Sequence, residues 1–206
     1  MATLSKLRLG VNFGTLVGHS TIRRALLGEE SRDLTFKELD VFKAVVRQAL
    51  EEGAFGVSTG LGYNHSRNTP YLEVKLVAEL AAKYNGVYAT HLRNEREKIV
   101  DSVTETMNIA KEASVRTLIS HFRAISGYVP QFEQATALLA ADAANSKIHF
   151  DGYPFDYSML PIYTLLPEWA QRGNMESMLT TIKDPVSAAE IFRTLPVFRG
   201  EDVTIA

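Results

Sequence analysis

Strand-like and helix-like segments alternate along most of this chain, and no other sequence feature limits its fold as much. Five short apolar runs of strand length are each separated from the next by a segment with apolar residues at helical spacing. Strands that alternate with helices form a parallel sheet with right-handed crossovers. The predicted strands are residues 9–19, 54–61, 86–91, 115–121 and 147–151.

The segments between these strands carry helix signals of their own. Thr35 and Glu38 form a capping-box pair ahead of an apolar stripe that stops at Gly53, which predicts a helix. Pro130 stands where a first helical residue belongs. Four helices are predicted between the strands, at residues 36–50, 72–81, 99–110 and 131–144. Beyond residue 160 the pattern is less regular, with short helices expected at 175–182 and 186–195 and a strand-like run at 203–206.

Two folds fit a run of strand–helix units: a doubly wound sheet and a (β/α)8 barrel. The G-x-G-x-x-G turn of a dinucleotide-binding sheet is absent. A complete barrel typically takes about 250 residues, so five strands in 206 residues predict one incomplete barrel domain over residues 1–206, with the less regular part at 160–206. Polar or ring-bearing residues stand at or just past every predicted strand end, as barrel active sites require: His19, Ser58, Tyr63, His91, His121, Asp151 and Tyr153.

Composition argues against several kinds of partner. The net charge is −2 and no basic stripe is present, so neither nucleic acid nor an acidic membrane surface is expected to bind. No apolar run approaches the roughly 20 residues of a membrane span, and the first residues lack the apolar core of a signal peptide, so the cytoplasm is the expected compartment. The chain has no cysteine, so histidine, aspartate and glutamate must supply any metal site.

Two of the strand-end histidines predict a metal site. His91 ends one predicted strand, His121 ends the next, and a single helix-length segment lies between them. The carboxyl ends of parallel strands face one crevice, so both imidazoles should point into the same pocket, and imidazole is a common zinc ligand. A single histidine after an apolar run is more often structural, and His19 fits a turn before a helix as well as it fits a functional role.

Five short motifs extend this picture from single residues to most of the chain: LVGHSTIR (16–23), FGVSTGLGY (55–63), YATHLRNE (88–95), ISHF (119–122) and DGYPF (151–155). In this order and spacing they resemble the N-acyl-D-amino-acid deacylases, or D-aminoacylases, of the amidohydrolase superfamily. ATHLR and ISH, whose histidines are 30 residues apart, are the most specific. The resemblance implies that the five strands are the third to seventh of the barrel, with the first and last strands missing. It also implies that His91 and His121 are zinc ligands.

The activity implied by this resemblance is zinc-dependent hydrolysis of the amide bond of a small-molecule N-acyl-D-amino acid. One or two zinc ions would lower the pKa of bound water toward ~7 and polarise the carbonyl, while a carboxylate carries the proton. In the family an H-x-H pair, a cysteine and an eighth-strand aspartate complete the centre, and these would lie before Met1 or beyond Ala206. Because the aspartate that would act as the base lies beyond Ala206, no catalytic base is assigned within the sequence. Two ligands alone also make a weak zinc site, so the chain alone is expected to be inactive.

Substrate contacts are also implied by the resemblance. Family members carry a cation, usually lysine, two positions after the sixth-strand histidine, and tyrosines after the fourth and seventh strands. Arg123, Tyr63 and Tyr153 occupy these positions and would clamp the α-carboxylate of the substrate. Arginine grips a carboxylate bidentately and is not a neutral replacement for lysine, so the substrate preference need not follow the usual pattern.

Two other interpretations stay open at this point. The chain could be a noncatalytic or degenerate structural module whose histidines only pack. It could also be another amidohydrolase, such as a dihydroorotase or hydantoinase, although these normally carry a bridging lysine on the fourth strand and residues 54–61 contain none. In any of these cases an incomplete barrel leaves strand edges uncovered, which predicts self-association.

Overall fold

The computed structural model of this chain describes residues 6–8, 10–30, 32–144, 147–155, 157 and 159–195. The chain divides into two compact units, Met1–Pro154 and Phe155–Ala206. The strand predicted at 203–206 lies outside the described residues. No helix in the described ranges is both long and apolar enough to cross a lipid bilayer.

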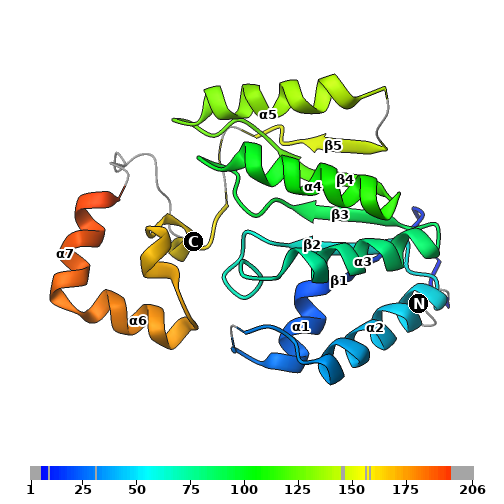
Figure 1. Ribbon diagram of the computed structural model, residues 1–206, viewed down its shortest axis with the longest axis horizontal. Helices are drawn as coiled ribbons and strands as arrows, with labels where there is room; N and C mark the ends of the chain where they lie inside the picture. The colour runs from blue at the N-terminus through cyan, green and yellow to red at the C-terminus, as the bar shows by residue number, and fades with distance from the viewer. Residues whose placement is uncertain are drawn as a thin grey trace. The chain divides into compact units, whose positions relative to one another are not determined.

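The first unit contains a five-stranded sheet in which every pair of neighbouring strands is parallel (Figure 1). Its spatial order follows the chain order from β1 to β5. In a doubly wound sheet the spatial order of the strands reverses at a switch point, whereas in a barrel each strand is added beside the previous one. The observed order therefore confirms the predicted partial barrel. The strands are β1 (Leu16–Gly18), β2 (Gly56–Gly60), β3 (Val87–His91), β4 (Arg116–Phe122) and β5 (Ile148–Gly152).

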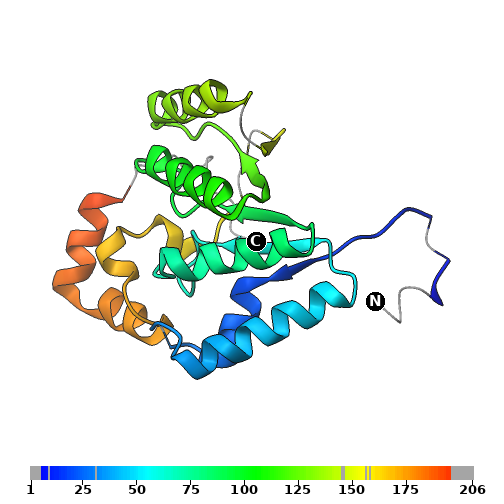
Figure 2. The same cartoon turned by 45° about the vertical axis from the view of Figure 1, so that its right-hand side comes forward.

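The crossover helices pack against the sheet and against one another in sequence order (Figures 1 and 2). Thr35 caps the second helix, its side chain accepting from the Glu38 amide at 3.3 Å while the Glu38 carboxylate accepts from the Thr35 amide at 2.8 Å, so the predicted capping box is confirmed. The helices of this unit are α1 (His19–Leu27), α2 (Phe36–Glu51), α3 (Tyr71–Lys83), α4 (Ile99–Ala113) and α5 (Val129–Asp142).

The first predicted strand was too long, and the helix that follows it was not among the four predicted helices. The ladder of β1 covers only Leu16–Gly18, and the helix α1 begins at His19. The apolar run at 9–19 resembles a strand, yet it contains Gly10 and Gly14, which weaken a strand, and only its last part pairs with β2. His19 therefore lies at the start of a helix rather than at the end of a strand.

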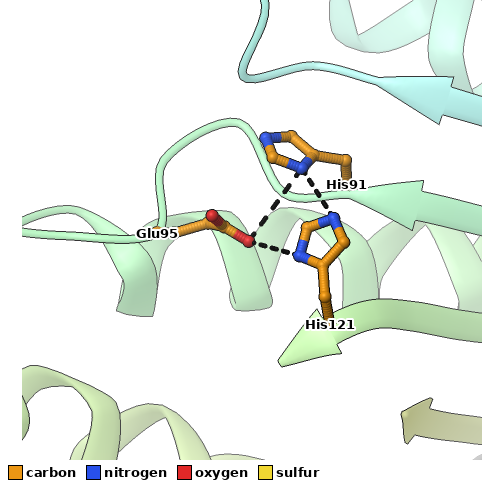
Figure 3. Close-up of side chains that lie close together, drawn as sticks. All are labelled: His91, Glu95 and His121. Atoms are coloured by element: carbon orange, nitrogen blue, oxygen red, sulfur yellow. Dashed lines mark hydrogen bonds and ion pairs between the residues drawn. The ribbon is translucent and has the colours of Figure 1, made fainter. Parts of the chain in front are cut away.

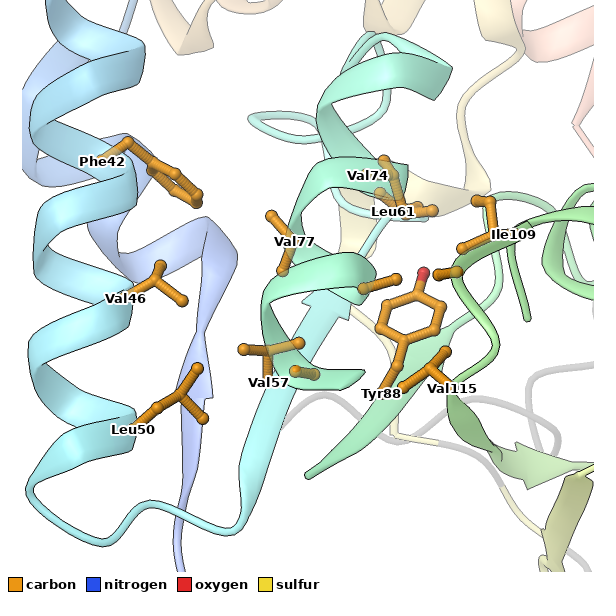
Figure 4. Close-up of a cluster of buried hydrophobic side chains, with 13 residues drawn as sticks. Phe42, Val46, Leu50, Val57, Leu61, Val74, Val77, Tyr88, Ile109 and Val115 are labelled. Carbon is orange, nitrogen blue, oxygen red and sulfur yellow. The ribbon is translucent and has the colours of Figure 1, made fainter. Parts of the chain in front are cut away.

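The main hydrophobic core lies between β2, β3 and the helices α2, α3 and α4 (Figure 4). Tyr88 is fully buried in this core. Its hydroxyl lies 3.1 Å from the Thr59 hydroxyl, which in turn donates to Thr90 at 2.9 Å, so the polar groups at the centre of the core are hydrogen-bonded. The side chains labelled in Figure 4 are Phe42, Val46, Leu50, Val57, Leu61, Val74, Val77, Tyr88, Ile109 and Val115.

The second unit is helical over the residues that are described. It contains the 3-10 turns η2 (Ile162–Leu165) and η3 (Glu168–Gln171), followed by α6 (Met175–Lys183) and α7 (Pro185–Thr194). The two helices predicted here are confirmed, with Pro185 as the first residue of α7.

Candidate metal centre

The two predicted histidines meet at the carboxyl edge of the sheet. His91 is the last residue of β3 and His121 is the second-last residue of the neighbouring strand β4. His91 Nδ1 lies 2.8 Å from His121 Nε2, and the ring centroids are 4.6 Å apart (Figure 3). The strand-end rule therefore placed both imidazoles correctly in one small site.

A local irregularity in β4 directs the His121 side chain. His121 has a φ of 44°, a left-handed conformation that is uncommon outside glycine. The register between β4 and β5 shifts between Ile119 and Phe122, as at a β-bulge, and the Asp151 carboxylate accepts from the His121 backbone amide. Bulges and strained residues cluster at functional sites, where they re-aim side chains.

Glu95 joins the two histidines and was not recognised in the sequence. It lies in the loop after β3, and its Oε1 atom is 2.8 Å from His121 Nδ1 and 4.0 Å from His91 Nδ1 (Figure 3). One donor atom from each residue lies within 4.8 Å of the other two. Glu95 closes the YATHLRNE motif, but it stands among the charged residues of the segment 93–98, a composition that is typical of a solvated helix entrance.

The three side chains perturb one another's ionisation. Burial lowers the pKa of His91, whereas the neighbouring Glu95 carboxylate raises the pKa of His121. Burial works to raise the pKa of Glu95, but contact with His121 and the charges of His91 and Arg123 outweigh it, and the net pKa is lowered. These shifts favour an ionised Glu95 carboxylate and a neutral His91, which are the protonation states of metal ligands, whereas His121 would have to release its proton to bind a cation.

This donor set fits a divalent cation such as zinc. Imidazole nitrogen and carboxylate oxygen are both ordinary zinc ligands, and three protein ligands with one open position are typical of catalytic sites. Tetrahedral zinc separates its ligand atoms by about 3.3 Å, a value that the 2.8 and 4.0 Å contacts of Glu95 Oε1 bracket. Within the described residues, the buried His121 Nδ1 atom has no hydrogen-bond partner of acceptable geometry, although Glu95 lies so close.

The three residues expected to contact substrate surround this cluster. Tyr63 stacks on the His91 ring with centroids 4.8 Å apart and planes 16° apart. The Arg123 guanidinium lies 4.3 Å from the centroid of the Tyr153 ring, and its Nη2 atom is 3.8 Å from Glu95 Oε2. Tyr63, Arg123 and Tyr153, which follow β2, β4 and β5, therefore lie beside the cluster in the structure.

Three further side chains with suitable chemistry lie outside the cluster. Arg93 donates to Glu105 at 2.7 and 3.0 Å and to the Thr69 carbonyl at 3.1 Å. His65 is half-buried, and its ring stacks on that of Tyr63 with the ring centroids 6.1 Å apart. His149 is exposed on β5. None of these three contributes a donor to the cluster.

The absence of a side chain at Gly62 makes room for the His91 ring. A Cβ atom at this position would lie 2.4 Å from His91 Nε2 and 3.0 Å from the Leu92 carbonyl oxygen. We therefore expect Gly62→Ala to displace the imidazole and weaken zinc binding about 10-fold, the lower end of effects from ligand misorientation. Chelator competition measures this affinity, with Gly152→Ala as control because a Cβ there meets no atom within 4 Å. Equal affinities for both variants would contradict this placement of His91.

Together, a parallel sheet in chain order and paired histidines at adjacent strand ends define part of a (β/α)8 barrel with a candidate metal site at its carboxyl edge. No protein-family model matches the chain. A curated D-aminoacylase from Alcaligenes xylosoxydans xylosoxydans is 32% identical over 148 residues, which are 70% of this chain and 30% of the relative. The matched part of the chain belongs to the N-acyl-D-amino-acid deacylase family of amidohydrolases.

Solved structures agree with this assignment. A D-aminoacylase structure described as defining a novel subset of amidohydrolases has a TM-score of 0.66 and 35% identity, over 70% of this chain and 31% of its own. N-acyl-D-glutamate deacylase from Bordetella bronchiseptica, complexed with zinc and a phosphonate inhibitor, has a TM-score of 0.69 and 27% identity. The match covers 75% of this chain and 33% of the deacylase chain. The chain spans about a third of the length of the relatives it matches.

Proposed function

We propose that this chain forms part of a zinc-dependent hydrolase that cleaves the amide bond of N-acyl-D-amino acids, with His91 and His121 as zinc ligands. The 2.8 Å approach of the two imidazoles on neighbouring strands is the observation that carries the proposal. The kinship with D-aminoacylase, and the zinc in the structure of the related glutamate deacylase, support it. A cytoplasmic location is a further part of the proposal.

The chain's own residues would bind and orient the substrate. Arg123 Nε is buried and makes no hydrogen bond in the described part of the chain. A donor beside the cluster of His91, Glu95 and His121 is therefore available to the substrate α-carboxylate. Tyr153 holds the guanidinium from one face, and Tyr63 covers the His91 ring. Bound zinc would supply an acidified water and a polarised carbonyl.

A chimaera tests this function. The segment of the Alcaligenes D-aminoacylase that aligns with this chain is replaced by the chain itself, and release of free D-amino acid is measured. We expect zinc-dependent release from N-acyl-D-amino acids, little from the L-enantiomers, and none after His91→Ala. A well-folded, zinc-loaded chimaera without hydrolytic activity would contradict the proposal.

The isolated chain should behave differently from the chimaera. We expect little or no turnover, because the family's catalytic aspartate has no assigned counterpart in this sequence. The same assay of D-amino acid release, run on the purified polypeptide with added zinc, measures this. Robust zinc-dependent turnover would show that a base within this chain suffices.

A further inference from the structure

We propose that Glu95 is a third protein ligand, so that this chain holds one zinc ion with its own set of two histidines and one glutamate. The inference rests on the proposed role of His91 and His121 and adds a donor from the loop after β3. It changes the expectation for the isolated chain, because three protein ligands make a zinc site where two make only a weak one.

The position of Glu95 supports direct coordination. The Glu95 side chain is 12% exposed. Its Oε1 atom points between the two imidazoles and lies 2.8 Å from His121 Nδ1 and 4.0 Å from His91 Nδ1 (Figure 3). The short contact between Glu95 Oε1 and His121 Nδ1 lacks the geometry of a hydrogen bond, so this buried nitrogen is not satisfied by a shared proton. A cation between them would satisfy both, since each would present a lone pair to it.

The other carboxylate oxygen is held away from the histidines. Glu95 Oε2 lies 3.8 Å from Arg123 Nη2, and the Arg123 guanidinium is in turn held over the ring of Tyr153. Oε2 therefore faces the Arg123 guanidinium, and Oε1 faces the two imidazoles. This division suits a carboxylate that binds metal through a single oxygen.

The loop that carries Glu95 is fixed on both sides of it. On one side, Arg93 is anchored to Glu105 of α4. Next to Glu95, the Asn94 side chain accepts from the backbone amides of Arg96 at 2.8 Å and Lys98 at 3.1 Å. Anchors on the flanking residues preorganise the carboxylate, and ligands held by such a supporting shell bind metal more tightly than mobile ones.

The alternative is that Glu95 only orients His121 from outside the coordination sphere. Carboxylates commonly support zinc-bound histidines in this way, and their loss typically costs 10–100-fold in metal affinity. Direct ligation predicts a larger loss on removing the carboxylate, and it also predicts rescue by a different donor. If Glu95 only orients His121, the Glu95→His variant should not recover zinc affinity, because its imidazole cannot replace a carboxylate that supports His121 from outside the coordination sphere.

The experiment titrates the metal-free purified chain with zinc against a chromophoric chelator and records the visible spectrum of its cobalt form. The variants are Glu95→Gln, Glu95→His, and the control Asp101→Asn, which changes an exposed carboxylate in the first turn of α4. Circular dichroism checks that each variant is folded. We expect one zinc ion per chain, a loss of more than about 100-fold for Glu95→Gln with a changed cobalt spectrum, partial recovery for Glu95→His and no change for the control.

The outcomes separate this inference from the proposed function. A loss of 10–100-fold for Glu95→Gln with an unchanged cobalt spectrum, or no recovery in Glu95→His, would overturn direct ligation while leaving the histidine ligands in place. Zinc binding that is insensitive to His91→Ala would instead overturn the proposed metal centre itself.

Discussion

Replacing His91 by alanine will weaken zinc binding by more than about 100-fold, and replacing His121 will do the same. Each substitution removes a nitrogen donor from a cluster whose donor atoms all lie within 4.8 Å of one another. Loss of a direct ligand exceeds the 10–100-fold cost of losing an outer partner. Metal content after dialysis, measured by mass spectrometry, and chelator competition report the change.

His149→Ala is the matched control for these two variants. His149 lies on the same sheet, in β5, but its side chain is exposed and takes no part in the cluster. Its removal should leave zinc content and affinity unchanged. If His91→Ala and His121→Ala retained as much zinc as the His149 variant, the histidines would be packing residues and the ligand assignment would be wrong.

The sheet and its histidines were predictable because both depend on periodic, local signals. Parallel strands in chain order bring consecutive strand ends together, so His91 and His121 come to the same edge of the sheet. Tyr63, Arg123 and Tyr153 were placed by the family resemblance, and the structure brings them to the same edge. Their role in binding substrate stays a prediction.

The loop residues were not predictable in the same way. The position of Glu95 depends on the path of an irregular segment that is anchored by Arg93 and Asn94, and no periodicity encodes that path. His121 also has a left-handed conformation, and its backbone amide donates to the Asp151 carboxylate, a partner 30 residues away in the sequence. Both features arise from tertiary contacts that single-sequence patterns do not contain.

His19, whose role the sequence left open, belongs to a buried ionic cluster. His19 Nε2 lies 2.8 Å from Glu73 Oε1, and Arg23 Nε donates to the same oxygen at 3.1 Å. Arg23 also donates to the Arg32 carbonyl at 2.6 Å. His19 is fully buried and the side chains of Arg23 and Glu73 are only 4% and 6% exposed, so a single carboxylate of α3 neutralises the buried cation of α1.

Removing that carboxylate should strongly destabilise the first unit. We expect Glu73→Ala to lower the free energy of unfolding by about 3–5 kcal/mol, because the Arg23 guanidinium stays buried without its counter-charge. Urea unfolding followed by far-ultraviolet circular dichroism measures this loss. Circular dichroism is the suitable probe because the single tryptophan, Trp169, lies in the second unit.

Glu79→Ala, on the same helix, gives the matched control. Glu79 is 52% exposed and its partner Lys75 is 3.8 Å away, so this is a surface ion pair worth about 0–1 kcal/mol. The two substitutions remove the same chemical group from α3 and differ mainly in burial. The expected difference between them is therefore at least about 2 kcal/mol, and equal unfolding free energies would mean that the Arg23 charge is solvated and that α1 does not depend on Glu73.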